Sequence, residues 1–267
     1  MLEYNKKLRK IFPNSVTMLA LAFGVSSLNM AFWGHWQMAI FFISLSAFFD
    51  FMDGKIARLL RVESRFGAEL DSLSDFVSFG VAPGFLMYQW TMDPALKLDV
   101  LSGTAVRADA VGVPWGFALF LAMCCAMRLA RFNTMIDSDK EKPVYWKHFF
   151  MGVPAPAGAG IAIMPLVFWL ATGNQFDFFR SPVLVGFFLT FSAIMMASQI
   201  PTWCLKHIRL SNKHLLTLRI AFVFFVASLV SFPWITLSVM GISYLISIPV
   251  GIYYFRQFKK QEEDFNA

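Results

Sequence analysis

Residues 50–75 of this chain read DFMDGKIARLLRVESRFGAELDSLSD, and this stretch decides how the surrounding sequence folds. Long apolar runs flank it on both sides, and a basic turn lies at its middle. Asp50 and Asp53 are three residues apart, and Asp71 and Asp75 are four apart, so each pair shares one face of a helix. The sequence therefore predicts a hairpin of two apolar helices, each carrying a pair of carboxylates.

The depth of the four carboxylates predicts a metal site. At ~1.5 Å per residue, Asp53 and Asp71 lie roughly 10–14 Å from the turn near residues 60–65, and Asp50 and Asp75 lie roughly 16–18 Å from it. An antiparallel hairpin brings them to matching levels. A charge at mid-bilayer costs ~2.5–3.5 kcal/mol, and four carboxylates repel one another unless cations neutralise them. Oxygen-only ligands favour Mg²⁺ or Mn²⁺, so we expect all four aspartates to bind metal.

The residues between the carboxylates suit a phosphate substrate. Gly54, Ala57 and Gly67 remove side chains beside the aspartates, which lets a ligand or a neighbouring backbone come close. Arg58 can offer its charge to a phosphate or pair with a carboxylate. Two metal ions bridged by carboxylates would clamp a pyrophosphate, so phosphotransfer is the expected chemistry.

The composition indicates an all-α integral membrane protein. Hydrophobic residues make up 57% of the 267 residues and charged residues only 15%, which points to lipid as the solvent. The net charge is +6, and the basic residues are scattered among apolar spans. This distribution favours anionic lipid over nucleic acid as their partner. We expect eight transmembrane helices, near residues 14–34, 37–60, 66–90, 113–134, 155–173, 182–204, 215–231 and 234–255.

The basic residues predict the orientation of these spans. All but three of the 23 Lys and Arg residues fall at the termini or in loops on one side of the membrane. The exceptions are Lys97, Arg107 and Arg180. By the positive-inside rule, both termini are cytoplasmic and the active site faces the cytosol.

We expect a single transmembrane domain over residues 1–267. Residues 1–12 form either a short interfacial helix or a frayed basic tail before Pro13 starts the first span. We expect no cleaved leader, because this polar, basic segment leads directly into a full-length span. Residues 13–204 would form a six-helix catalytic core, and residues 215–255 two accessory C-terminal helices.

The pattern Asp50-x2-Asp53-Gly54-x2-Ala57-Arg58-x8-Gly67-x3-Asp71-x3-Asp75 resembles, position for position, the signature of the CDP-alcohol phosphotransferases. The resemblance implies metal ligation by the four aspartates, with Asp75 also acting as the general base. It implies that the CDP group binds Gly54 and Ala57, with the support of Arg58 and Gly67. A second element near the nucleotide is similar to the family at Pro13-Asn14-x2-Thr17. The implied CDP-binding set is Asn14, Thr17, Asp50, Asp53, Gly54, Ala57, Arg58, Gly67 and Asp71.

Other stretches look like the membrane-spanning phosphatidylserine synthases within that family, namely residues 69–83, 128–133 and 150–157. This resemblance implies CDP-diacylglycerol and L-serine as substrates, a homodimer and a bacterial cytoplasmic membrane. An amino-acid acceptor needs a cation for its carboxylate and polar partners for its ammonium group. The candidate serine-binding residues are Ser78, Arg128, Arg131 and Asn133.

Several alternatives stay open. The aspartates could pair with nearby arginines for packing alone. The arginines at the end of the fourth span could lie there only because the positive-inside rule places positive charge at that membrane edge. A divalent cation transporter would use the carboxylates as an ion site, although no matching half-repeats are visible. The same phosphotransfer chemistry could take glycerol 3-phosphate, choline or inositol phosphate as the acceptor. Gly80-x3-Gly84 could pack two copies of the chain against each other.

Overall fold

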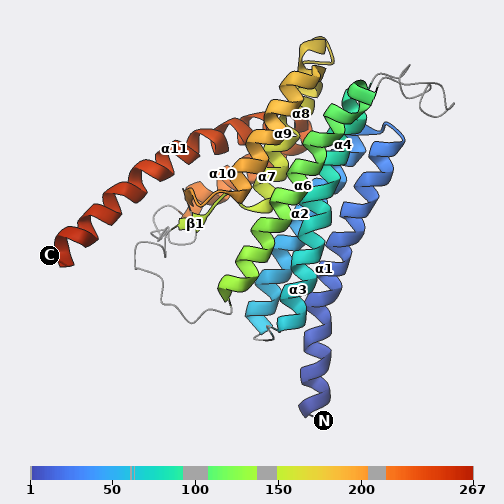
Figure 1. Ribbon diagram of the computed structural model, residues 1–267. Helices are drawn as coiled ribbons and strands as arrows, with labels where there is room; N and C mark the ends of the chain where they lie inside the picture. The colour runs from blue at the N-terminus through green and yellow to red at the C-terminus, as the bar shows by residue number, and fades with distance from the viewer. Residues whose placement is uncertain are drawn as a thin grey trace.

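The structure is a computed structural model, and it describes residues 2–60, 62, 64–92, 108–136, 149–203 and 215–266. The described chain is almost wholly helical, as predicted, and most of its helices run alongside one another (Figure 1). In chain order the elements are α1 (Leu2–Phe32), α2 (Trp36–Leu60), α3 (Arg65–Asp75), η1 (Phe76–Val81), α4 (Ala82–Thr91), α6 (Ala108–Ile136), β1 (Phe149–Met151), α7 (Ala155–Ala162), α8 (Met164–Ala171), η3 (Asp177–Arg180), α9 (Pro182–Ala197), β2 (Pro201–Trp203), α10 (Leu215–Ser231) and α11 (Pro233–Asn266).

Three segments of the described residues are long and apolar enough to cross a membrane, namely Ile11–Phe32, Pro114–Thr134 and Pro233–Phe258. The other expected spans are shorter or more charged. Helices α9 and α10 have 16 and 17 residues, and α2 and α3 carry the carboxylates. Large apolar side chains are more than half exposed around the bundle, as lipid contact requires; examples are Phe41, Phe48, Phe187, Val223 and Phe224.

The basic loops that predicted the orientation lie mostly outside the described residues. This holds for residues 93–107, with Lys97 and Arg107, and for residues 137–148 and 204–214. Arg180 is described, and its guanidinium donates to the carbonyls of Trp90 (2.7 Å) and Met92 (3.1 Å) at the end of α4. Arg180 therefore stabilises the end of α4. It lies on the side of the membrane to which the predicted orientation assigns only three basic residues.

The expected boundary at Pro13 is wrong, because α1 runs from Leu2 to Phe32 without a break. Ser15 Oγ donates to the Ile11 carbonyl (3.0 Å), and Thr17 Oγ1 donates to the Pro13 carbonyl (3.2 Å), within this continuous helix. Residues 2–12 therefore belong to the same helix as the first span, and their position at the membrane interface stays a prediction.

Helices α1 and α2 form a tight antiparallel pair. The turn between them uses Gly34 at φ 76°, a left-handed conformation that glycine adopts without strain. Buried Ser46 of α2 donates to the Ala20 carbonyl of α1 (2.8 Å), and the rings of Phe23 and Phe49 stack at 5.3 Å. This pairing fixes α2, and with it the first carboxylate pair, against α1.

The second arm of the carboxylate hairpin contains a π-helical turn. Helix α3 passes into η1 and then α4, and the Ala82 N–H bonds to the Val77 carbonyl five residues earlier. Such turns insert one extra residue and recur at functional sites. Gly80 and Asp75 both face Cys125 of α6, so this wider turn keeps them on the same side of the rod.

Gly80 in η1 and Gly84 in α4 pack inside the chain, so the expectation that they pair two copies is wrong. A Cβ atom at Gly80 would lie 3.0 Å from Cys125 Cβ, and one at Gly84 would lie 3.1 Å from the Ala118 carbonyl oxygen. Both partners belong to α6. The small residues therefore let η1 and α4 approach α6 closely.

The last expected span of the core ends early. The span predicted to reach residue 204 becomes α9, which stops at Ala197, because the residue before Pro201 disfavours helix. Residues Pro201–Trp203 instead pair antiparallel with Phe149–Met151 in a two-stranded ribbon that the sequence did not predict. Thr202 Oγ1 donates to the carbonyl of Gly152, whose φ is 77° (2.7 Å).

The C-terminal helices meet at the break that the sequence indicated. Helix α10 ends at Ser231 and α11 begins at Pro233, where proline suits the first helical position. Ser228 and Thr236 hydroxyls are 2.7 Å apart across the turn. Helix α11 runs to Asn266, beyond the expected end at residue 255, and extends away from the bundle in Figure 1.

The close contact between α4 and α6 gives a stability prediction. Gly84→Leu drives its side chain into the backbone of Ala118, so the unfolding temperature in detergent should fall, with a cost of about 1–3 kcal/mol. Gly116→Leu is the matched control, because a Cβ at Gly116 meets nothing within 4 Å. Equal stability of the two variants would contradict this packing.

Candidate active site

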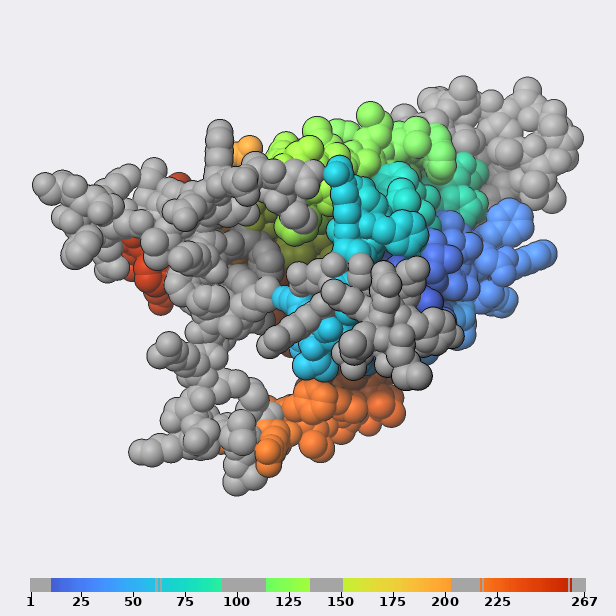
Figure 2. Space-filling model, turned by 90° about the horizontal axis from the view of Figure 1, so that it is seen from below, coloured from blue at the N-terminus to red at the C-terminus, as the bar shows by residue number. Residues whose placement is uncertain are grey.

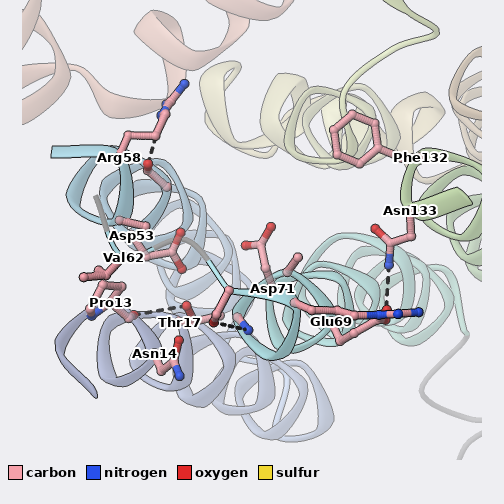
Figure 3. A pocket seen from close by; sticks show the side chains of 16 residues that line it. Pro13, Asn14, Thr17, Asp53, Arg58, Val62, Glu69, Asp71, Phe132 and Asn133 are labelled. Atoms are coloured by element: carbon pink, nitrogen blue, oxygen red, sulfur yellow. Dashed lines mark hydrogen bonds between the residues drawn. The ribbon is translucent and has the colours of Figure 1, made fainter. Parts of the chain in front are cut away.

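A cavity of about 590 Å³ opens at the end of the bundle where α2 ends and α3 begins (Figure 3). Figure 2 views this end of the molecule, with α1 in blue, the α2–α3 turn in cyan and α6 in green. Helix α1 forms one wall, α2 and α3 form the floor, and the end of α6 closes the far side. Its lining residues are Pro13, Asn14, Thr17, Asp53, Gly54, Ala57, Arg58, Val62, Ser64, Arg65, Gly67, Ala68, Glu69, Asp71, Phe132 and Asn133.

Three of the four aspartates form a cluster at this cavity. Asp50, Asp53 and Asp71 each place a carboxylate oxygen within 4.8 Å of the other two. Figure 3 shows the Asp53 and Asp71 carboxylates facing each other from α2 and α3. Asp53 is only 5% exposed, and its Oδ2 has no hydrogen-bond partner. A cluster of carboxylates with an unfilled buried acceptor atom could hold a cation, and oxygen donors fit a hard divalent ion.

Asp75 lies apart from this triad. It is one helical turn beyond Asp71, and its carboxyl group interacts with that of Asp50. Its Oδ1 is buried and has no hydrogen-bond partner. The helix hairpin therefore gathers all four carboxylates as predicted, but it sets Asp75 one layer deeper than the cavity lining.

Small residues keep the cavity open between the carboxylates and α1. A Cβ at Gly54 would meet nothing within 4 Å, so a larger side chain there would fill the space of the cavity itself. A Cβ at Gly67 would lie 3.2 Å from both Asn14 Oδ1 and Ser64 Oγ. Gly67 thus brings α3 close to α1, and Gly54 and Ala57 leave room for a ligand.

The other expected CDP-binding residues also line the cavity, except Asp50. Thr17 is buried, and Ser74 Oγ donates to its carbonyl (3.4 Å), which ties α3 to α1. Arg58 Nε donates to the Gly54 carbonyl (3.0 Å), and Figure 3 shows its guanidinium directed away from Asp53 and Asp71. Arg58 therefore lies at the rim, where it can meet a ligand that extends out of the cavity.

The four candidate serine-binding residues do not form one group. Asn133 lines the cavity, donates to Glu69 Oε2 (3.3 Å) and accepts from Ser72 Oγ (3.1 Å). Arg131 Nη1 donates to the Ala197 carbonyl of α9 (2.9 Å). Both side chains therefore hold α6 to its neighbours.

Arg128 and Ser78 do not line the cavity, and they face different neighbours. Arg128 interacts electrostatically with Asp50 and Asp75, and its Nε is buried without a hydrogen-bond partner in the described residues. Ser78 is fully buried in η1, where its side chain packs closely against Gly24 of α1. Of the two, only Arg128 therefore leaves a polar atom near the carboxylates.

Sequence reasoning missed several residues of the cavity. Ser64 caps α3 by accepting a hydrogen bond from Gly67 N (3.1 Å), and Ser followed by a helix is a readable cap signal. Phe132 is 52% exposed and presents its ring to the cavity opposite α2. Its apolar character gave no distinguishing signal among 31 phenylalanines.

Comparisons with known proteins agree with this site. A model of the CDP-alcohol phosphatidyltransferase family matches residues 10–204, and a model described as CDP-alcohol phosphatidyltransferase 2 matches residues 215–249. The chain is 32% identical over 244 residues to a CDP-diacylglycerol–serine O-phosphatidyltransferase of Mycobacterium leprae, which covers 91% of this chain and 75% of that protein. Similar proteins with the same description occur in Helicobacter pylori (30% identity over 191 residues, 70% of each chain) and Saccharomyces cerevisiae (34% over 142 residues, 53% of this chain and 45% of that one).

The carboxylate cluster predicts divalent-ion binding that can be measured without turnover. Asp53→Asn removes one charge from the triad, so the Mn²⁺ concentration needed to raise the unfolding temperature should increase at least about tenfold. Asp177→Asn is the control, because Asp177 is an exposed aspartate in η3, outside the cavity. An unchanged Mn²⁺ response in Asp53→Asn would remove Asp53 from the ion site.

Proposed function

We propose that this chain, which belongs to the CDP-alcohol phosphatidyltransferase family, transfers the phosphatidyl group of CDP-diacylglycerol to L-serine and releases CMP. The observation that carries this proposal is the triad of Asp50, Asp53 and Asp71, which meets at an open cavity of a size that suits a nucleotide. The descriptions of the relatives support CDP-diacylglycerol as the donor and serine as the acceptor.

The carboxylates would hold divalent ions. Asp50, Asp53 and Asp71 offer oxygen ligands close enough for a shared ion, and Asp75 could contribute to a second one through Asp50. Bound Mg²⁺ or Mn²⁺ would neutralise the pyrophosphate and stabilise charge on the attacking and leaving oxygens. The residues of α2 and α3 thus fix where the reacting phosphate must lie.

The CDP group would occupy the cavity between α1 and α2. Gly54 and Ala57 leave the space, Asn14 and Thr17 offer polar atoms from α1, and Arg58 offers charge at the rim. The acyl chains would stay in the bilayer beside the exposed apolar side chains. The headgroup is therefore bound at the cytosolic end while the lipid tails need not leave the membrane.

Asp75 is the candidate general base. As the serine hydroxyl oxygen forms a bond to the β-phosphorus, the bond between that phosphorus and the bridging oxygen of CMP breaks, and CMP carries the electron pair away. The hydroxyl proton passes to Asp75, whose buried Oδ1 has no other partner. A single displacement of this kind needs no covalent intermediate on the protein.

Arg128 is the better of the two arginines for the acceptor carboxylate. Arg131 already donates to the backbone of α9, whereas Arg128 has a buried Nε without a partner beside Asp75. An acceptor whose carboxylate meets Arg128 would present its hydroxyl near the base. Ser78 is the weaker candidate for the ammonium group, because its side chain packs against Gly24 of α1.

We also propose the arrangement of the chain in the membrane. The eight apolar segments would all cross the bilayer, with both termini and the cavity on the cytosolic side of a bacterial cytoplasmic membrane. Two copies would form a homodimer, as the family resemblance implies. Residues 13–204 would carry most of the site.

The reaction is tested by CMP release from CDP-diacylglycerol with Mg²⁺ or Mn²⁺ across a panel of alcohols. We expect release to depend on L-serine and to stop when a chelator removes the divalent ion. Stimulation by glycerol 3-phosphate, choline or inositol phosphate instead would keep the site and change the acceptor. If no acceptor supports release from folded protein that still binds Mn²⁺, the cation-transporter alternative becomes the better explanation.

The role of Asp75 is tested by Asp75→Asn, which keeps the size of the side chain and removes its basicity. Turnover should fall at least about 100-fold, while binding of CDP-diacylglycerol stays close to normal. Turnover and a thermal-shift measurement of CDP-diacylglycerol binding, each against the Asp177→Asn control, separate the two effects. Near-normal turnover in the variant would exclude Asp75 as the base.

A further inference from the structure

Helix α11 packs on the catalytic core through one face. Trp234, Leu237, Tyr244, Leu245 and Ile252 are partly buried against the core, and Ile248 on the same face is 7% exposed. One turn before Tyr244, a Cβ at Gly241 would lie 3.2 Å from the side chain of Met164 in α8. The close approach at Gly241 and the burial of Ile248 fix Tyr244 from both sides.

The hydroxyl group of Tyr244 is buried and has no hydrogen-bond partner within the described residues. Nearly all buried polar atoms in proteins are bonded, and phenol groups are no exception. A tyrosine on a helix that otherwise packs through apolar groups gains nothing from its hydroxyl unless something binds it. The unfilled hydroxyl therefore points to a ligand.

The nearby unfilled atoms identify where that ligand lies. Arg128 interacts electrostatically with Tyr244 as well as with Asp50 and Asp75. The Nε of Arg128 and the Oδ1 of Asp75 are themselves buried without partners in the described residues. The indole N–H groups of Trp90 and Trp169 are also unpartnered there, but those rings pack on each other at 5.7 Å in the apolar core. Arg128 therefore connects the unfilled hydroxyl of Tyr244 to the unfilled carboxylate oxygen of Asp75.

We propose that Tyr244, from the C-terminal helix pair, forms part of the acceptor pocket and donates its hydroxyl to the carboxylate that Arg128 binds. The proposal rests on the function proposed above and names the group that selects an amino-acid acceptor. Arg128 and Tyr244 supply donors for a carboxylate, while Asp75 takes the hydroxyl proton. Choline has no carboxylate to meet this pair, and a phosphorylated alcohol would call for more positive charge.

It follows that the C-terminal helices are part of the catalytic unit. Tyr244 lies within residues 215–249, which match a separate family model from that of the core. The expected division into a catalytic core and two accessory helices would then be incomplete, because specificity for the acceptor comes from α11. Loss of α11 would leave the nucleotide cavity in place, since no α11 residue lines it.

The test is Tyr244→Phe, which removes only the hydroxyl group and keeps the packed ring. The KM for L-serine should rise about tenfold or more, as expected for a lost hydrogen bond to a charged group. The KM for CDP-diacylglycerol and the Mn²⁺ response should stay unchanged. Tyr253→Phe is the matched control on the same helix, because Tyr253 is 61% exposed.

A second acceptor separates recognition from packing. Serinol replaces the carboxylate of serine with a hydroxymethyl group, so Tyr244→Phe should lower the preference for L-serine over serinol about tenfold. The L-serine concentration that protects the protein against thermal unfolding should rise to the same extent, which gives a readout without turnover. A variant with unchanged L-serine KM, or with both substrates' KM values raised together, would overturn the role of Tyr244.

The result also distinguishes this inference from the proposed function. If the unchanged protein releases CMP in response to L-serine but Tyr244→Phe behaves like Tyr253→Phe, only the inference fails. If L-serine neither binds nor reacts, both fail. If L-serine binds with Tyr244 dependence but no CMP appears, the pocket stands and the proposed reaction falls.

Discussion

The structure depends on bringing several carboxylates together in a place that water reaches poorly. Asp50, Asp53 and Asp71 cannot stay charged side by side in a low-dielectric interior without a cation, and the membrane offers no counter-charge of its own. Contacts of the neighbouring helices hold these aspartates close to one another. The tight pairing of α1 with α2, the cap at Ser64 and the glycine at residue 67 hold the helices where the three carboxylates lie within 4.8 Å of one another, close enough to share an ion.

The π-helical turn links this ion site to the rest of the bundle. With its wider turn between Asp75 and Gly80, it brings both residues to the side of the rod that faces Cys125 of α6. The same rod therefore carries the carboxylates at one end and packs closely against Ala118 through Gly84 at the other.

Helical periodicity was enough to predict the hairpin and the matching depth of the aspartates, because those features depend only on local spacing and on the turn between the arms. The family resemblance added the residues of the nucleotide cavity, and most of them line it. Periodicity failed where the backbone departed from the α-helix, at the π turn before Gly80 and at Pro201 after α9. It could not separate Arg128 from Arg131 either, since their partners Asp75 and Ala197 come from distant parts of the chain.

A membrane enzyme of this kind must solve two binding problems in different solvents. The nucleotide end of the proposed donor is charged and polar, and the small residues and the arginine at the rim suit an open cavity for it. An acceptor as small as serine has few atoms to recognise, and each one must be met by a buried, preorganised group. Buried donors such as Arg128 and Tyr244 are costly to leave unfilled, and under the proposed function this cost would let them reject an alcohol that lacks the carboxylate. The deep position of Asp75 fits the same requirement, because a base in that position would meet the hydroxyl group of the acceptor rather than bulk water.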